Sequence, residues 1–131
     1  MNYSQEFENI SDLIHNASVG IHFVNSDGII IYANSTELEM LGYTEGEYIG
    51  HHTSEFQLED HILCDMMTRL GQQETLKNYP AKVKAKQGVK YVLFNSTAYF
   101  KDEKFVHTRC FAADIYKPVY DAFVSHSEYF K

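Results

Sequence analysis

Apolar residues near the start of the chain recur at the spacing of one helix face. The stripe consists of Tyr3, Phe7, Ile10 and Ile14, which follow one another in steps of four, three and four residues. This spacing predicts an amphipathic helix over residues 3–16. An apolar stripe has to be covered, either by the protein's own sheet or by a second copy of the chain. In the second case these four residues are the contacts of a homodimer.

Two short apolar runs come next, over residues 19–25 and 29–34. Both are rich in β-branched and aromatic side chains, and Asp27 and Gly28 stand between them. Asp-Gly between two such runs is a strong signal for a tight turn that joins antiparallel strands. These runs therefore predict a β-hairpin.

Helix signals fill the stretch that follows the hairpin. Asn34 can cap a helix with Glu37 three residues later, and Thr44 can cap a second helix with Glu47. The clearest helix pattern covers residues 58–70 and ends at a glycine. At about 100° per residue, one face of this helix collects Leu58, Ile62, Leu63, Met66, Met67 and Leu70.

The remaining pattern predicts three strands, over residues 75–86, 89–100 and 105–115, joined by two polar turns. Pro118 can stand in the first turn of a C-terminal helix. Strands that are split around a helical insert indicate an α+β domain with one antiparallel sheet. We therefore expect a flanking helix over residues 1–16, a domain over residues 17–116, and a C-terminal helix or linker over residues 117–131.

Composition narrows the classes of function. The chain has 131 residues, of which 44% are hydrophobic and 15% aromatic, so it predicts one folded domain rather than a disordered segment. The formal net charge of −7 disfavours nucleic acid as a partner. Cys64 and Cys110 form neither a disulfide framework nor a close-spaced metal pair, which favours a reducing, cytoplasmic location. No apolar run is long enough to predict a membrane span.

Several short motifs occur in an order that is typical of one family. They are Gly20-Ile21 before the hairpin, Tyr32-Ala33-Asn34 after it, residues 41–50 (LGYTEGEYIG), Lys86-Gln87-Gly88, and Asp114-Ile115. This set resembles a PAS domain, a sensory module of histidine kinases, cyclic-di-GMP enzymes and transcription regulators. The resemblance covers about residues 15–116. It implies a five-stranded antiparallel sheet in the order 2-1-5-4-3, with short helices inserted between strands 2 and 3.

The resemblance also implies how a signal leaves the domain. In the family, an Asp-Ile-Thr junction ties the last strand to the helix that follows it. Asp114, Ile115 and Tyr116 occupy the matching positions and are therefore the expected relay residues. Tyr116 departs from the threonine of the family, and Gln87 departs from the aspartate that usually precedes Gly88.

The known cofactors of PAS domains each require particular side chains. Flavin photosensors of the LOV type use a reactive cysteine, but the matching stretch, residues 51–57, contains none, and Leu93 replaces the flavin-contacting asparagine. Haem-binding modules use a histidine of the central helix. His61 lies about 150° from Met66 on a helix wheel, so we expect it to face solvent, and Cys64 also falls off the apolar face. We therefore expect neither flavin adduct nor haem. His51 and His52 lack a third ligand, and no metal site is expected.

Strand alternation determines which side chains can line an interior pocket. By the resemblance, the lining positions are His22, Val24, Leu38, Leu41, Met66, Leu93, Asn95, Thr97, Thr108 and Cys110. A buried histidine or asparagine without a partner costs about 1–3 kcal/mol. We therefore hypothesise that His22, Asn95 and Thr108 bind a small polar or aromatic ligand. In the alternative, these groups satisfy one another in a collapsed core.

The resulting functional expectation is a signal-sensing module that relays the state of its core through flanking helices. The effector would be a partner protein or a further domain of histidine kinase or cyclic-di-GMP type. Two alternatives remain, a ligand-free protein–protein dimerisation scaffold and, less favoured, a haem-binding gas or redox sensor. The sequence has no P-loop, no Gly-x-Ser-x-Gly motif and no cysteine beside a motif-bearing histidine, so no enzymatic activity is expected.

Overall fold

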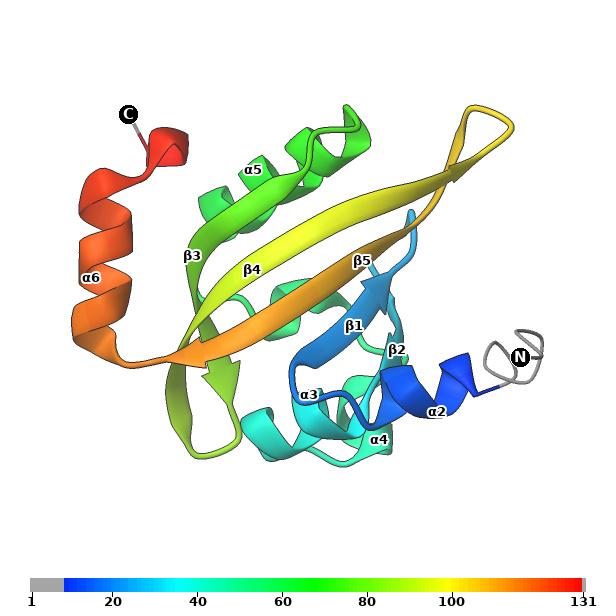
Figure 1. Cartoon of the computed structure of the whole chain (residues 1–131), viewed down its shortest axis with the longest axis horizontal. Helices are drawn as coiled ribbons and strands as arrows, with labels where there is room; N and C mark the ends of the chain where they lie inside the picture. The colour runs from blue at the N-terminus through cyan, green and yellow to red at the C-terminus, as the bar shows by residue number, and fades with distance from the viewer. Residues whose placement is uncertain (1–8, 131) are drawn as a thin grey trace, which may run out of the picture.

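The computed structural model describes residues 9–130. Five strands form one antiparallel sheet in the order β2-β1-β5-β4-β3, with helices between β2 and β3 (Figure 1). The α+β class and the strand order predicted from the sequence are confirmed. The strands are β1 Gly20–Val24, β2 Ile30–Ala33, β3 Leu76–Ala85, β4 Gly88–Lys101 and β5 Lys104–Ile115.

Short helices connect and flank these strands. They are α2 Ile10–His15, α3 Ser35–Leu41, α4 Glu45–Tyr48, α5 Asp60–Gly71 and α6 Lys117–His126, with 3₁₀ turns η1 Thr53–Glu55 and η2 Glu128–Phe130. None of the helices within residues 9–130 is both long enough and apolar enough to cross a membrane.

The β1–β2 hairpin closes at the expected turn. The amide of Gly28 donates to the carbonyl of Asn25 over 3.0 Å, and Gly28 has a φ of 79°. Residues with a side chain rarely adopt this left-handed backbone, which explains glycine at this position. The ring of His52 also packs where a side chain at Gly28 would lie.

The central helix α5 presents the predicted apolar face to the sheet. Met66 and Leu70 are buried, whereas His61 and Cys64 are exposed. The helix begins at Asp60 rather than at Leu58, which is 44% exposed. The orientation expected for this helix is therefore confirmed, and only its start differs.

The N-terminal helix α2 is described from Ile10 onward, so Tyr3 and Phe7 lie outside the described residues. Ile10 is 40% exposed, and Ile14 is partly buried. The described half of the apolar stripe is therefore incompletely covered by the protein's own sheet. Whether a second copy covers it stays a prediction.

The C-terminal helix α6 lies beside the edge strand β3 (Figure 1). The ring of Tyr120 packs against Tyr91 of β4 with 5.0 Å between ring centroids, and the ammonium of Lys82 lies 5.8 Å from the Tyr120 ring. These contacts hold α6 against β3 and β4.

Candidate functional site

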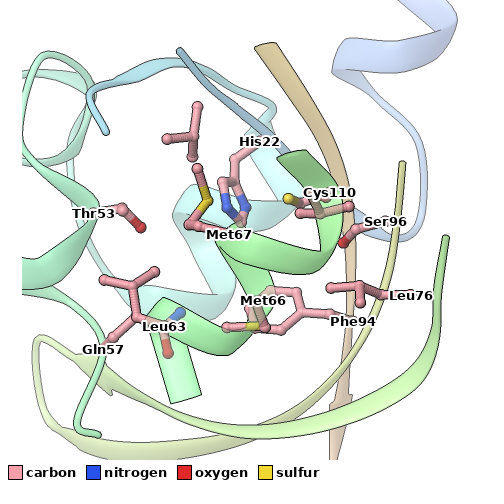
Figure 2. A pocket seen from close by; sticks show the side chains of 12 residues that line it. His22, Thr53, Gln57, Leu63, Met66, Met67, Leu76, Phe94, Ser96 and Cys110 are labelled. Carbon is pink, nitrogen blue, oxygen red and sulfur yellow. The ribbon is translucent and has the colours of Figure 1, made fainter. Parts of the chain in front are cut away.

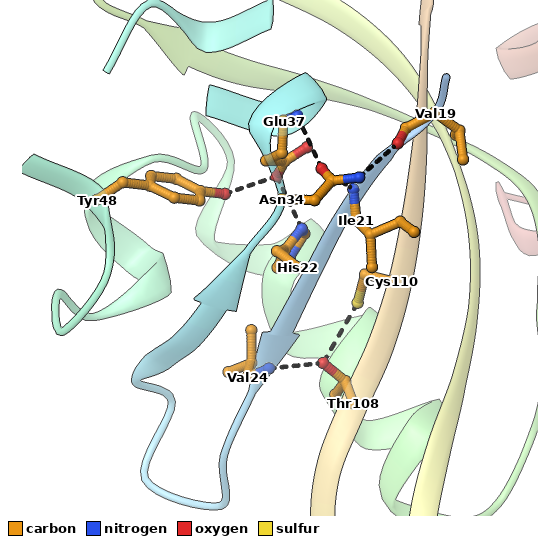
Figure 3. A network of polar contacts seen from close by, with 9 residues as sticks. All are labelled: Val19, Ile21, His22, Val24, Asn34, Glu37, Tyr48, Thr108 and Cys110. Carbon is orange, nitrogen blue, oxygen red and sulfur yellow. Dashed lines mark hydrogen bonds and ion pairs between the residues drawn. The ribbon is translucent and has the colours of Figure 1, made fainter. Parts of the chain in front are cut away.

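A buried carboxylate lies at the centre of the domain. Glu37, in the first turn of α3, is only 2% exposed. Its Oε2 atom accepts a hydrogen bond of 2.8 Å from the hydroxyl of Tyr48 and lies 2.8 Å from Nδ1 of His22 (Figure 3). The His22 contact is close enough for an ion pair, but its angle falls short of a hydrogen bond.

Asn34 holds this carboxylate in place by fixing the start of α3. Its Oδ1 atom accepts from the amides of Glu37 and Ile21, both over 2.9 Å. Its Nδ2 atom donates to the carbonyls of Ile14 and Val19, both over 3.0 Å. One side chain thus caps α3 and joins it to β1 and to the end of α2. The predicted helix cap at Asn34 is confirmed.

The expected capping partnership of Glu37 is wrong, however. The Glu37 side chain turns into the core toward His22 and Tyr48 instead of returning to the start of its helix. Gly20 makes room for it, since a Cβ atom at Gly20 would lie 2.6 Å from Oε1 of Glu37. Glycine is therefore required at this point of β1 by the close approach of a carboxylate.

Cys110 lies next to His22 in the sheet. The two residues face each other in the β1–β5 register, and Ser96 faces Cys110 from β4 on the other side. The Cys110 thiol donates to the Thr108 hydroxyl over 3.3 Å, and that hydroxyl accepts from the Val24 amide over 3.0 Å (Figure 3). Thr108 therefore links the thiol to β1.

Electrostatics in this cluster favour charged side chains despite their burial. Burial lowers the pKa of His22, but Cys110 and then Glu37 outweigh it and raise that pKa well above its ordinary value. Burial raises the pKa of the Cys110 thiol, but His22 outweighs it and brings that pKa below its ordinary value. Burial and the Glu37 carboxylate raise the pKa of Tyr48, which keeps the phenol protonated as a donor.

Two small cavities adjoin the cluster, and His22 lines both. The larger lies between α5 and the sheet, and the space open to the centre of a water molecule is about 20 Å³ (Figure 2). The smaller lies between α3, α4 and the sheet and has about 10 Å³ of such space. Each is large enough for about one water molecule.

Three buried polar atoms border these cavities without a hydrogen-bond partner. Within residues 9–130, they are Nδ1 of His22, Oε1 of Glu37 and Oγ of Ser96. His22 and Ser96 line the larger cavity, and His22 and Glu37 line the smaller. Buried polar side chains are usually satisfied, so their grouping around these spaces points to small polar molecules inside the domain.

The structure brings together about half of the residues predicted to line a pocket. His22, Val24, Met66 and Cys110 line the larger cavity, and Leu41 lines the smaller one. Thr108 is completely buried beside Cys110 but lines neither cavity. Leu38 packs against the core and also lines neither.

The predicted lining face of β4 is wrong. Leu93, Asn95 and Thr97 point away from the two cavities, whereas Phe94 and Ser96 line the larger one. Asn95 and Thr97 are exposed, and the Oδ1 atom of Asn95 accepts from the Asn78 amide over 3.0 Å. Neighbouring residues of a strand face opposite sides, so a displacement of one residue in the expected register reverses the whole set.

The expected relay residues have contacts other than the family pattern implies. Asp114 forms an ion pair with Lys90 of β4, with 3.1 Å between Oδ2 and Nζ. Ile115 is partly buried, and Tyr116 is 84% exposed, with its carbonyl accepting from amides in the first turn of α6. The Asp114 side chain thus contacts the sheet and not the departing helix.

Two side chains of α5, Asp65 and Arg69, form contacts that reach the C-terminal segment. The guanidinium of Arg69 pairs with Asp65 over 2.9 Å and lies 5.0 Å from the ring centroid of Tyr129. The same Asp65 oxygen accepts from the Tyr79 hydroxyl over 2.7 Å, and the Tyr129 hydroxyl accepts from the Lys77 amide over 2.8 Å. No short-range pattern in the sequence pairs residues this far apart, so sequence analysis missed the connection.

Metal ligands are not gathered in the described part of the chain, where no group of three His, Cys, Asp or Glu side chains is placed to hold an ion. His51 pairs with Glu55 over 3.2 Å, whereas His52 accepts from the amide of Ser54. These adjacent histidines therefore face different partners. His61, the candidate haem ligand, is 77% exposed.

The family model for the PAS fold matches residues 8–117. The chain belongs to the PAS-domain family. The curated proteins include no match to this PAS domain.

Solved structures show the same fold at low sequence identity. The PAS domain of an HTR-like protein from Haloarcula marismortui is 18% identical, with a TM-score of 0.71 over 86% of this chain and 93% of that one. A PAS domain from a two-component sensor histidine kinase is 15% identical, with a TM-score of 0.69 over 87% and 100%. The Rhodobacter sphaeroides LOV protein is 18% identical, with a TM-score of 0.71 over 89% and 70%.

Proposed function

We propose that this PAS domain is the input module of a signalling protein and that its signal is a small polar molecule bound beside His22. The observation that carries the proposal is the grouping of two unpartnered polar atoms, Oε1 of Glu37 and Oγ of Ser96, with the ion-paired His22 around two internal cavities. Each such atom costs about 1–3 kcal/mol when it stays unsatisfied. A ligand that supplies the missing hydrogen bonds recovers that free energy.

The chemistry of the cavity defines the ligand class. Oε1 of Glu37 requires a donor, and the Ser96 hydroxyl can donate or accept, whereas Nδ1 of a protonated His22 already faces the Glu37 carboxylate. Because the cavities hold about one water molecule each, anything larger than a few atoms must displace side chains. Met66 and Met67 line the larger cavity and are the most adaptable of its walls.

Such a displacement would act on α5, the helix that carries both methionines. The same helix carries Asp65 and Arg69, which contact Tyr79 and Tyr129. A ligand that moves α5 would therefore change the position of η2 and α6. The requirement is that the ligand binds one arrangement of α5 more tightly than the other. The effector would be a partner or a further domain of histidine kinase or cyclic-di-GMP type.

A second candidate function is a ligand-free protein–protein dimerisation scaffold. The small size of the cavities, about 20 and 10 Å³, favours it. The exposed side chains of Ile10 and Leu13 on α2 offer an apolar contact for such a partner. In this case the unpartnered polar atoms would be satisfied by single waters.

A ligand screen by thermal shift distinguishes these candidates. Binding adds RT ln(1 + [L]/Kd) to the stability of the folded state, so a ligand raises the midpoint of unfolding. Hits should weaken in Ser96→Ala, which lines the larger cavity, and persist in Thr97→Ala, which is exposed on the same strand. Hits that are indifferent to Ser96→Ala would place the ligand elsewhere and overturn the proposal. A screen of small polar molecules without any hit would support the scaffold.

A further inference from the structure

Cys110 is buried at the one point of the sheet where a histidine and a serine face it from both sides. His22 of β1 and Ser96 of β4 are its partners in the strand register. All three side chains line the larger cavity (Figure 2). The sulfur thus borders a water-sized space between an acid–base group and a hydroxyl.

We propose that Cys110 is a modification site, at which hydrogen peroxide enters the larger cavity and oxidises the sulfur to a sulfenic acid. The proposal concerns the same cavity as the function proposed above, but it requires neither a reversible ligand nor a relay to α6. Its evidence is the arrangement of the side chains around the sulfur.

One unpartnered, fully buried hydroxyl indicates that the space beside the sulfur holds a polar molecule. The Ser96 hydroxyl belongs to a residue that is 2% exposed and makes no hydrogen bond. His22 is 5% exposed and lines the same cavity, while its Nδ1 atom is paired with the Glu37 carboxylate over 2.8 Å. The cavity volume of about 20 Å³ suits a molecule of the size of water or slightly larger, and hydrogen peroxide has only one oxygen atom more than water.

The surroundings stabilise the thiolate that the reaction requires. The Thr108 hydroxyl accepts from the Val24 amide, so its own proton is available to the sulfur once the thiol is ionised. His22 supplies the positive charge, and the lowered pKa of Cys110 agrees with this arrangement. A thiolate, not a thiol, is the nucleophile in cysteine oxidation.

The step balances with the groups in the cavity. The Cys110 thiolate attacks one oxygen of hydrogen peroxide, the S–O bond forms, and the O–O bond breaks. The departing hydroxide takes a proton from the His22 imidazolium and leaves as water. The sulfur loses two electrons and the peroxide gains them, which leaves a sulfenic acid and a neutral imidazole. Ser96 would donate a hydrogen bond to the peroxide and hold it against the sulfur.

Access to the cavity does not require unfolding of the sheet. Gln57, Leu63 and Met67 line the cavity and are themselves partly exposed. These side chains form the wall between the cavity and solvent. Rotation of long, flexible side chains takes picoseconds to nanoseconds when they are exposed, so a small oxidant can pass them.

Cys64 provides an internal comparison, because it is exposed on α5 and lies away from the cluster. Exposure alone would make Cys64 the more reactive thiol. The proposal predicts the reverse, with Cys110 oxidised first. The test therefore follows both cysteines in one protein. The folded protein is treated with hydrogen peroxide, the oxidant is removed, the protein is unfolded in dimedone to trap sulfenic acids, and peptide mass spectrometry locates them.

Variants then assign the roles of the neighbours in a Cys64→Ser background. Loss of the proton donor in His22→Gln should slow labelling of Cys110 on the order of 10²-fold. Ser96→Ala should slow it about 10-fold, the effect of one hydrogen bond of ordinary strength. Thr97→Ala, which is exposed on the same strand, should leave the rate unchanged.

A pH profile keeps the proposal testable where a buried variant fails to fold. In the folded Cys64→Ser protein, the labelling rate should remain high below the ordinary pKa of a thiol, 9.0. Oxidation of Cys110 no faster than that of Cys64 in the protein that keeps both cysteines, or oxidation that occurs only when peroxide is added to unfolded protein, would overturn the proposal.

Failure of this proposal and failure of the proposed function give different results. The modification site alone would be rejected by two results together. Reversible ligands would still bind the Cys110→Ser variant, and Cys110 of the unsubstituted protein would show no selective oxidation. Selective oxidation without any reversible ligand would reject the small-molecule input and leave the modification site in place.

Discussion

His22 and Glu37 form a close pair of opposite charge inside the PAS core, with 2.8 Å between Nδ1 and Oε2. Neither side chain is more than 6% exposed, so both lose nearly all of their hydration. Such a pair gives little net stability relative to an apolar pair, but removal of one partner leaves the other charge buried and uncompensated. The stability of the core therefore depends on the charge of both residues.

Replacement of Glu37 tests this sensitivity. Glu37→Gln keeps the shape of the side chain and removes the negative charge beside His22, so we expect the free energy of unfolding to fall by about 3 kcal/mol. Urea unfolding measures the change. The matched control is Glu55→Gln, which breaks the exposed pair with His51 and should cost no more than about 0.5 kcal/mol. Equal effects of the two substitutions would show that burial gives the Glu37 pair no special role.

Gly20→Ala tests the fit between β1 and the Glu37 carboxylate. The added Cβ atom would lie 2.6 Å from Oε1, so the carboxylate must shift away from His22 and Tyr48. We expect a loss of about 1–3 kcal/mol, as for other overpacked cores. At Gly46, in α4, a Cβ atom meets nothing within 4 Å, and Gly46→Ala should stabilise by up to about 1 kcal/mol. Thermal unfolding of the two variants should therefore shift in opposite directions.

The fold could be predicted from the sequence because its signals are local. The Asp27-Gly28 turn, the Asn34 cap and the apolar face around Met66 each depend on a few neighbouring residues, and the structure contains all three. The resemblance then supplied the strand order, which no local pattern carries. Local signals that agree with one another are the usual sign of a foldable sequence.

The site could be predicted only in part because its residues meet through tertiary structure. His22 and Cys110 lie in the interior, as predicted, but Asn95 and Thr97 of β4, which the resemblance places inward, are exposed. Because Ser96 is small and polar, the sequence does not mark it as an inward residue. The alternation between inward Phe94 and its outward neighbours is therefore not apparent from the sequence. The position of Glu37 three residues after Asn34 fits a helix-capping role as well as a buried one. Only Gly20, which leaves room for the carboxylate, explains why the Glu37 side chain points into the core.

The dependence of stability on pH tests the charge state of His22 and Cys110. Because the folded pKa of His22 is raised, its contribution to stability is complete below 6.5 and is lost as pH rises through the folded value. Because the folded pKa of Cys110 is lowered, its contribution is complete above 9.0 and is lost as pH falls through the folded value. Between 6.5 and 9.0 the two contributions change in opposite directions.

We therefore expect the Cys110→Ser variant to lose the Cys110 contribution and to keep only the part of the His22 contribution that the Glu37 carboxylate supplies. Its free energy of unfolding should decrease more steeply from pH 6.5 to 9.0 than that of the unsubstituted protein, since serine does not ionise in this range. Urea unfolding at a series of pH values gives both slopes. Cys64→Ser is the matched control and should follow the unsubstituted protein, because Cys64 is exposed. Parallel curves for all three proteins would mean that Cys110 stays a neutral thiol throughout the range.

The contact between α5 and the C-terminal segment can be tested at Tyr129. Its hydroxyl accepts a 2.8 Å hydrogen bond from the Lys77 amide, while its ring packs on Tyr79 and on the guanidinium of Arg69. Tyr129→Phe keeps the ring and removes the acceptor, so we expect a loss of about 0.5–1.5 kcal/mol in stability. The local effect should be larger, with faster hydrogen exchange at the Lys77 amide and along α6.

Tyr99→Phe provides the control for the lost hydroxyl, because Tyr99 lies in β4 beyond the β3–β4 pairing, with its ring 4.5 Å from the Arg109 guanidinium. Exchange at Lys77 and in α6 should not change in that variant. If Tyr129→Phe likewise leaves the exchange of α6 unaltered, the Lys77 contact does not restrain the helix. The proposed relay through α5 would then lose its support.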